Sequence, residues 1–231
     1  MPHNLDRRRL VRAASGVLLA GGLVPLGAAG AEEEGGNDCT EVTAPEDLMR
    51  EHGVLNRMLL IYEAVLDRLG RGEGFDVTVL ARAANVVREF VENYHERNEE
   101  QHLFPRFRQA GKMVALVDVL YQQHQAGRRL TDNILGLVRT GSVAADDRPM
   151  LVGNLRAFSR MYRPHEARED TVLFPQLRNV VSAHEFAAMA EDFEKDEHRK
   201  FGGDGFEMMV ARVADLEKAI GINDLARFTP S

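Results

Sequence analysis

The chain has 231 residues, of which 44% are hydrophobic and 28% charged, a normal composition for one or two globular domains. Aromatic residues make up 6%, Trp is absent and Pro totals 8, which disfavours a β-sandwich or β-barrel and favours a helical bundle. A single cysteine, Cys39, excludes an intramolecular disulfide and any metal site that needs several thiolates. The formal charge of −7 disfavours nucleic acid as the main partner.

The segment from Met1 to Ala31 has the order of a secretory signal. The arginine-rich start, Arg7-Arg8-Arg9-Leu10-Val11-Arg12, precedes an apolar run rich in glycine and alanine from Ala13 to Leu26. Ala29-Gly30-Ala31 then forms a small-residue cleavage pattern directly before the acidic Glu32. With Asp6 in front of the first arginines, the segment resembles the twin-arginine type of export signal.

A transmembrane anchor is the alternative interpretation of this segment. Gly21, Gly22 and Pro25 weaken a span of about 20 apolar residues, so cleavage after about Ala31 is favoured. We therefore expect an exported protein of the periplasm or cell envelope, with no stable membrane insertion after signal cleavage. Loss of four arginines and one aspartate with the segment would change the formal charge from −7 to −10.

The rest of the chain is predicted to be helical. Thr43 can cap the first helix, with Pro45 in the first turn and Glu46 three residues after the cap. Ser182 and Glu185 form the same capping pattern for a later helix. Breaks that contain glycine or aspartate separate helices predicted over residues 44–69, 76–107, 112–140, 147–180, 182–200 and 206–220.

Short connections between the four long helices predict antiparallel neighbours. No stretch alternates apolar and polar residues convincingly, as a half-buried strand would. We therefore expect an all-α protein whose core is an up-down-up-down four-helix bundle. The expected divisions are a signal at 1–31, a flexible linker at 32–43, the bundle at 44–181 and a C-terminal helical extension at 182–231.

The second and fourth predicted helices carry the same motif at a constant offset, without a gap. The first copy consists of His95 and Glu99, followed by Leu103-Phe104-Pro105. The second copy consists of His165 and Glu169, followed by Leu173-Phe174-Pro175. The helix before each motif contains one further histidine, His52 in the first half and His124 in the second. The bundle is therefore predicted to consist of two helical hairpins of one design, in which the two phenylalanines are core anchors and the prolines bend or end their helices.

The spacing within the repeat favours a metal site. A histidine and a glutamate four residues apart share a helix face, with a rise of about 6 Å between them. The four histidines stand at nearly the same distance along the helix from the turn of their own hairpin, which places them in one layer of an antiparallel bundle. A lone histidine–glutamate pair of this spacing is more often a solvated ion pair than a set of metal ligands, and a lone core histidine is usually a buried residue with a hydrogen-bond partner. Six polar groups that converge in a core need partners, and cations supply them.

Taken together, these motifs resemble the hemerythrin-like (HHE cation-binding) family over about residues 45–180. The resemblance implies a four-helix bundle around two non-haem iron ions with an oxo or hydroxo bridge, and dioxygen as the usual small ligand. It implies that the histidines are terminal ligands and that the glutamates bridge the ions. The implied metal ligands are His52, His95, Glu99, His124, His165 and Glu169.

One position departs from the oxygen-carrying members of that family. They have a second histidine four residues after the one on the third helix, where this chain has Arg128. The remaining ligand set leaves an open position on both ions, which favours chemistry with oxygen, peroxide or nitric oxide as much as reversible carriage.

The other histidines and acidic residues are predicted to lie outside the ligand set. A ferritin-like scheme would use Glu99 with His102, but the matching position in the second repeat is Val172. Glu100 and Asp170 are expected to face solvent or to contact the ligands without binding metal. His102 is expected at the periphery and His184 and His198 at the surface, with His198 the one candidate for a supplementary ligand.

Three functions are compatible with this sequence. The favoured one is a di-iron protein that binds or senses dioxygen or a related diatomic in the cell envelope. The second is a di-iron oxidase or peroxidase that acts on reactive oxygen or nitrogen species, and the third is a metal-storage or structural module. The enzyme ranks second because no substrate pocket is evident in the sequence, although four tyrosines are candidate redox-active side chains: Tyr62, Tyr94, Tyr121 and Tyr162.

Overall fold

The computed structural model describes residues 42–230, so the predicted signal, its cleavage site and Cys39 lie outside the described residues. Helix α1 spans Ala44–Gly70 and begins as predicted. The Thr43 backbone N–H and hydroxyl both donate to the Glu46 carboxylate, while Pro45 occupies the first turn. This capping box satisfies backbone donors that would otherwise have no partner at the start of the helix.

The second bundle helix runs from Val77 to Gln109 after the Asp76 cap, close to the predicted 76–107, but its hydrogen bonding is irregular. Two α-helical segments alternate with two π-helical ones before a final α-helical stretch. In chain order these are α2 (Val77–Val86), η2 (Val87–His95), α3 (Glu96–Asn98), η3 (Glu99–Leu103) and α4 (Phe104–Gln109).

The third helix, α5, spans Val114–Val138 and is regular throughout. The fourth begins with the short η4 (Ala145–Asp147), and its long α-helical part also ends in irregular turns. These parts are α6 (Arg148–Arg168), the π-helical η5 (Glu169–Leu173) and the 3₁₀-helical η6 (Phe174–Asn179). The extension consists of α7 (Ala183–Phe201), α8 (Gly205–Ile220) and η7 (Leu225–Phe228), the last of which was not predicted.

The repeated Leu-Phe-Pro sequences explain the two matching π turns. The Phe104 N–H bonds to the Glu99 carbonyl, and the Phe174 N–H bonds to the Glu169 carbonyl, in each case five residues back. The proline after each phenylalanine has no N–H and its ring collides with the carbonyl four residues earlier, so the turn before it widens. Each π turn starts at one of the two glutamates of the repeat.

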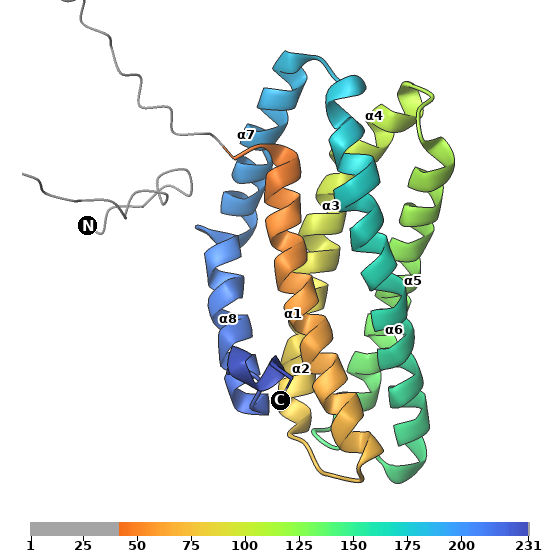
Figure 1. Cartoon of the computed structure of the whole chain (residues 1–231), viewed down its shortest axis with the longest axis vertical. Helices are drawn as coiled ribbons and strands as arrows, with labels where there is room; N and C mark the ends of the chain where they lie inside the picture. The colour runs from red at the N-terminus through yellow and green to blue at the C-terminus, as the bar shows by residue number, and fades with distance from the viewer. Residues whose placement is uncertain (1–41, 231) are drawn as a thin grey trace, which may run out of the picture. The chain divides into compact units, whose positions relative to one another are not determined.

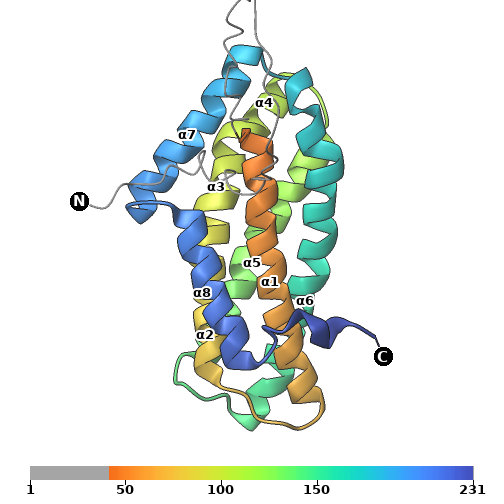
Figure 2. The same cartoon turned by 60° about the vertical axis from the view of Figure 1, so that its left-hand side comes forward.

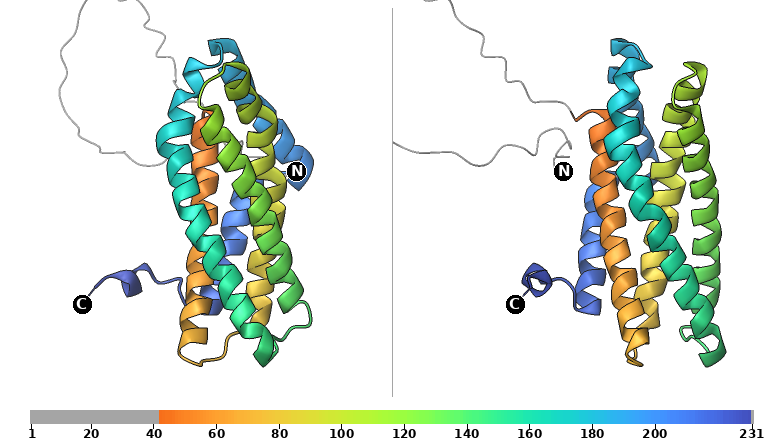
Figure 3. Two further views of the ribbon diagram at one scale, coloured as in Figure 1. Left: turned by 90° about the vertical axis from the view of Figure 1, so that its right-hand side faces the viewer. Right: turned by 45° about the vertical axis from the view of Figure 1, so that its right-hand side comes forward.

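The helices form the predicted all-α, up-down-up-down four-helix bundle with additional C-terminal helices (Figure 1). Helix α1 packs against α2 and α6, and α5 packs against α2 and α6, which closes the ring of four. Figure 3 shows α5 beside α6 on the side away from the extension. Helix α8 lies along α1 and α2, and α7 packs on α1 (Figure 2). None of the described helices has the length and apolar character that a membrane crossing requires.

Buried apolar side chains form two clusters rather than one continuous core. The cluster toward the α1–α2 turn includes Met58, Tyr62, Phe90, Phe158 and Tyr162, and the other includes Leu48, Phe104, Phe107, Phe174 and Phe193. On every bundle helix the residues between the two clusters are polar and buried. The fold therefore encloses a polar layer between two apolar ones.

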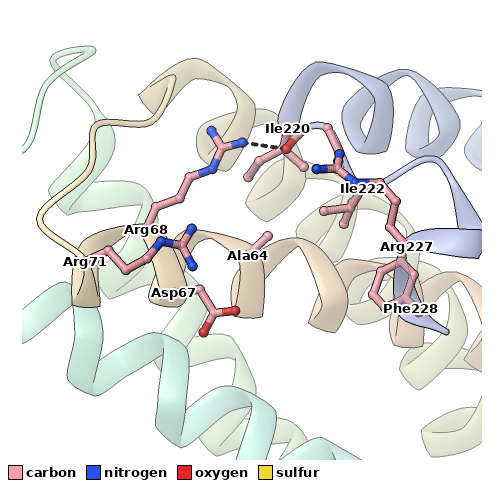
Figure 4. A pocket seen from close by; sticks show the side chains of 9 residues that line it. Ala64, Asp67, Arg68, Arg71, Ile220, Ile222, Arg227 and Phe228 are labelled. Atoms are coloured by element: carbon pink, nitrogen blue, oxygen red, sulfur yellow. Dashed lines mark hydrogen bonds between the residues drawn. The ribbon is translucent and has the colours of Figure 1, made fainter. Parts of the chain in front are cut away.

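The C-terminal extension is attached to α1 by arginine side chains (Figure 4). Arg68 donates to the Ile220 carbonyl at 2.7 Å, and Arg57 forms an ion pair with Glu217 at 2.6 Å. Arg227 donates to the Gly221 carbonyl at 2.6 Å, which holds the last described turn beside α1. These contacts satisfy carbonyls at the end of α8 that have no partner within the helix.

Tyr162 of α6 packs closely against Gly127 of α5, because a Cβ added to the glycine would lie 1.9 Å from Tyr162 Oη. We predict that Gly127→Ala lowers the free energy of unfolding by about 1–3 kcal/mol through overpacking, measured by chemical denaturation. Gly136→Ala on the same helix is the control, since nothing lies within 4 Å of its added Cβ. Tyr162→Phe should recover part of the loss in Gly127→Ala. A Gly136→Ala loss as large as that of Gly127→Ala would contradict the packing explanation.

Candidate metal centre

The polar layer brings together all six residues that the sequence predicted as metal ligands. His52 comes from the middle of α1 and His124 from α5, so each hairpin contributes one single histidine. The two repeated motifs place the remaining four on the facing helices, with both glutamates at the start of a π turn. All are at most 3% exposed: His52, His95, Glu99, His124, His165 and Glu169.

The ligand atoms form two overlapping groups, each within a 4.8 Å spread. One group contains His52 and His95, the other contains His124 and His165, and both contain Glu99 and Glu169. Each glutamate reaches a histidine of its own hairpin and one of the other hairpin. Glu99 Oε2 lies 3.8 Å from His95 Nε2 and 3.3 Å from His124 Nε2. Glu169 Oε2 lies 3.1 Å from His165 Nε2 and 3.3 Å from His52 Nε2.

The two central carboxylates are fully buried beside imidazole nitrogens. Glu99 and Glu169 are 0% exposed, and none of their four carboxylate oxygens accepts a hydrogen bond. Withdrawal of a carboxylate from water is costly unless it is paired or coordinates a cation. Four imidazole nitrogens and two carboxylates are a donor set that binds transition-metal ions well. The residues present therefore fit a pair of cations in the polar layer.

Each of the four histidines is held by its other ring nitrogen. His52 Nδ1 lies 2.7 Å from Asp170, His95 Nδ1 2.9 Å from Glu51, His124 Nδ1 3.0 Å from Glu100 and His165 Nδ1 2.9 Å from Gln123. An ionised carboxylate and the Gln123 amide oxygen only accept, so in a neutral imidazole of this layer Nδ1 carries the proton and the Nε2 lone pair faces the centre. Such contacts fix the orientation of a ligating imidazole and raise its basicity.

These partners follow the internal repeat, with one difference. Glu100 and Asp170 are equivalent positions of the repeat, and Glu51 and Gln123 each precede the single histidine of their hairpin. Gln123 is a neutral amide where Glu51 carries a charge. The histidines of the first group are thus supported by two carboxylates and those of the second by one, so the two candidate groups would differ in electron donation to a bound ion.

Arg128 lies just outside the centre and pairs with carboxylates. Its guanidinium contacts Glu96 Oε2 at 2.9 Å and Glu100 Oε1 at 2.8 Å. Tyr162 donates to the other Glu96 oxygen at 2.6 Å. The arginine therefore neutralises the acidic cluster behind the ligands. Its counterpart in the first hairpin is Asn56, which donates to Glu166, the repeat equivalent of Glu96.

The sequence interpretation missed several of these residues. It did not identify four residues as partners of the ligands, although each is adjacent to a predicted histidine ligand in the sequence: Glu51, Glu96, Gln123 and Glu166. Glu96 and Glu166 could have been found because they occupy the same position of the repeat. Glu51 and Gln123 gave no such signal, since only packing brings them against the histidine of the neighbouring helix.

The remaining described histidines lie outside the two groups. His102 Nε2 is 3.9 Å from Asp196 of α7, and its ring packs on Phe193. His198 donates to the Glu194 carbonyl within α7, and His184 is exposed at the start of that helix. The structure thus places His198, the proposed supplementary ligand, away from the centre.

Burial and mutual charge set the protonation of the metal-free site. Burial and the neighbouring Glu169 raise the pKa of Glu99. Burial acts in the same direction on Glu169, but His165 and His52 outweigh it and leave the pKa lowered. Burial lowers the pKa of His52, yet Asp170 and Glu169 raise it to about 10. At neutral pH the metal-free layer therefore retains a proton on His52.

Comparison with known proteins assigns this site to a family. Residues 43–177 match the hemerythrin HHE cation binding domain, a segment that contains all six candidate ligands. The chain belongs to the hemerythrin HHE cation-binding family. Domains of this family bind metal cations, commonly iron. Helices α7 and α8 follow the matched segment and are outside it.

Relatives with high identity come from mycobacteria. Proteins of Mycobacterium bovis and Mycobacterium tuberculosis, both described as uncharacterized, are 52% identical over 193 residues. That alignment covers 82% of this chain and 75% of each relative. No solved structure matches the chain.

Metal binding to this hemerythrin-family site should release protons. The raised pKa values of His52 and Glu99 mean that metal competes with protons up to a pH near 10 for the histidine. We predict release of about one proton per chain at pH 7, from His52, and an affinity for Mn²⁺ that rises from pH 6 to pH 8. Calorimetry in buffers of different ionisation enthalpy measures both. A pH-independent affinity with no proton release would contradict this protonation state.

Proposed function

We propose that this chain is a non-haem di-iron protein that binds or senses dioxygen or a related small diatomic. The observation that carries the proposal is the pair of buried glutamates whose oxygens lack hydrogen bonds and lie between two pairs of histidines. Each glutamate contacts histidines of both hairpins, as a residue that bridges two ions must. Two bound irons would supply reversible electron transfer to a diatomic ligand.

The protein surroundings favour a very small ligand. The six candidate ligands are at most 3% exposed, and both phenylalanines of the repeat stack on histidines of the layer. Phe174 lies over His52 with ring centroids 5.6 Å apart, and Phe104 lies over His124 at 5.4 Å. A closed surround excludes bulky organic substrates, whereas a diatomic or peroxide needs little space.

A di-iron oxidase or peroxidase is the second candidate, and Tyr162 is the observation that favours it. Its ring packs edge-on against His165 with centroids 5.5 Å apart, and its hydroxyl donates to the buried Glu96. A buried tyrosine beside a metal ligand can deliver an electron while its proton stays near an acceptor. Of the four tyrosines considered as redox-active groups, Tyr162 is the one in ring contact with a candidate ligand.

The proposal also includes export to the periplasm or cell envelope. It is supported by the sequence from Met1 to Ala31, where the arginine-rich start, apolar run and small-residue Ala29-Gly30-Ala31 follow the order of a cleaved signal. Export of the folded, metal-loaded chain through a twin-arginine route would preserve a centre that assembles inside a closed bundle.

Iron content and reaction with oxygen test the proposed function. Protein purified without chelators should contain about two irons per chain, and the reduced form should gain a near-ultraviolet charge-transfer band on exposure to air. Glu99→Ala and Glu169→Ala should lose most of the iron and the band, because no other described side chain reaches both histidine pairs. Glu191→Ala, an exposed carboxylate of α7, is the control and should behave as wild type.

The alternative functions give different results in the same experiment. Peroxide consumption well above that of free iron would favour the peroxidase, and iron without any reaction with oxygen would favour a storage or structural role. Manganese or zinc in place of iron would retain the site and remove the oxygen chemistry. Protein that retains no metal would overturn the proposal.

Export is tested separately on the full chain. Replacement of Arg7 and Arg8 by lysine should retain the protein in the cytoplasm if the twin-arginine route is used. N-terminal sequencing of exported wild-type protein should begin at about Glu32. An intact N-terminus on a membrane-bound protein would instead support the anchor interpretation.

A further inference from the structure

A pocket of about 320 Å³ lies between the second bundle helix and the C-terminal helix α7, on the outer side of the segment that carries His95 and Glu99. It is separate from the metal centre and is completed by a helix outside the family segment. Its lining residues are Asn93, Tyr94, Arg97, Asn98, Asp196, Arg199 and Lys200.

The pocket is positively charged in a chain that is acidic overall. Arg97, Arg199 and Lys200 line it, against one carboxylate, Asp196. That carboxylate is already paired, because Arg199 donates to it from the next turn of α7. Two cations therefore remain without a carboxylate partner in the pocket, whereas the chain as a whole has a net charge of −7.

Arg97 and Lys200 are brought together by the packing of α7 on the second helix. Lys200 donates to the Asn93 carbonyl, and Phe201 packs edge-on against Tyr94 at 5.4 Å. Arg97 forms no ion pair with any carboxylate of the described chain. Partial burial and the charge of Arg97 lower the pKa of Lys200, as expected for two like charges that face the same pocket.

A buried amide in the pocket is also without a partner. Asn98 is 2% exposed, and its Nδ2 makes no hydrogen bond. A buried donor is rarely left unsatisfied unless a ligand or water supplies the acceptor. The residue sits between the two candidate metal ligands of its helix, where α3 gives way to the π-helical η3. Such irregular turns are frequent at functional sites.

We propose that this pocket binds a small oxyanion, a phosphate or carboxylate group, held by Arg97, Lys200 and the Asn98 amide. Guanidinium and ammonium groups form charge-assisted hydrogen bonds with such oxygens, and the amide adds a neutral donor that fixes orientation. A water molecule would satisfy Asn98 and leave the two cations unpaired, whereas an oxyanion satisfies all three. The proposal goes beyond the metal function and does not depend on it.

Calorimetric titration of inorganic phosphate and, separately, acetate into the full chain tests the proposal. We expect one site per chain, with the better-bound ion showing whether the pocket prefers a phosphate or a carboxylate. Arg97→Gln and Lys200→Gln should each weaken binding by roughly tenfold, because each removes a charge-assisted hydrogen bond. Both residues are exposed, so the fold should be retained, and thermal melts will verify this.

The control is Arg212→Gln, which removes the same charge from an exposed site on α8 where the arginine pairs with Glu89. Its affinity for either ion should equal that of wild type. Equal weakening in this variant would show that general surface charge, not the pocket, attracts anions, and would overturn the proposal. Absence of binding for both ions at millimolar concentration would overturn it as well. Because metal-free protein can be titrated, failure here is distinct from failure of the di-iron function.

Discussion

Two carboxylates, Glu99 and Glu169, are buried in the centre of the bundle without hydrogen bonds. Their removal from water costs free energy, and the surrounding histidines and their partners are placed where this cost can be offset. A carboxylate withdrawn from water needs a positive partner, and four inward-facing imidazole nitrogens do not supply one while they are neutral. Cations between the histidine pairs would satisfy both acids at once. The polar layer therefore separates two apolar clusters that fix the positions of its helices.

The internal repeat extends beyond the ligands to the residues that support them. Glu100 and Asp170 hold the single histidines, and the π turns that begin at Glu99 and Glu169 recur with the same hydrogen bond. The symmetry ends at Gln123, which replaces a carboxylate by an amide. The two candidate ligand groups thus differ through the residues that support their histidines, and metal ions bound there would differ in the electron donation that they receive.

The C-terminal helices change the outer face of the second bundle helix. Helix α7 covers its middle and places Lys200 beside Arg97, while the family segment ends before α7 begins. The three-residue α3 lies between the two π segments, directly before the candidate ligand Glu99, and lines the basic pocket through Arg97 and Asn98. A ligand bound at either site would contact side chains of the same short backbone segment.

The sequence by itself determined the helical class, the order and approximate bounds of the helices, the two-hairpin repeat and the six candidate metal ligands. Those features depend on local chemistry and on periodicity, such as the Thr43 capping box and the His–Glu spacing of four, which are visible in one chain segment. Tertiary structure alone decided which side chains meet between helices. These contacts join residues that are far apart in the chain: Glu51 with His95, Gln123 with His165, and Arg128 with Glu96. The same packing places Asn98 in a basic pocket. Side-chain direction and helix packing create these contacts, and neither is encoded in the spacing of residues along a single helix.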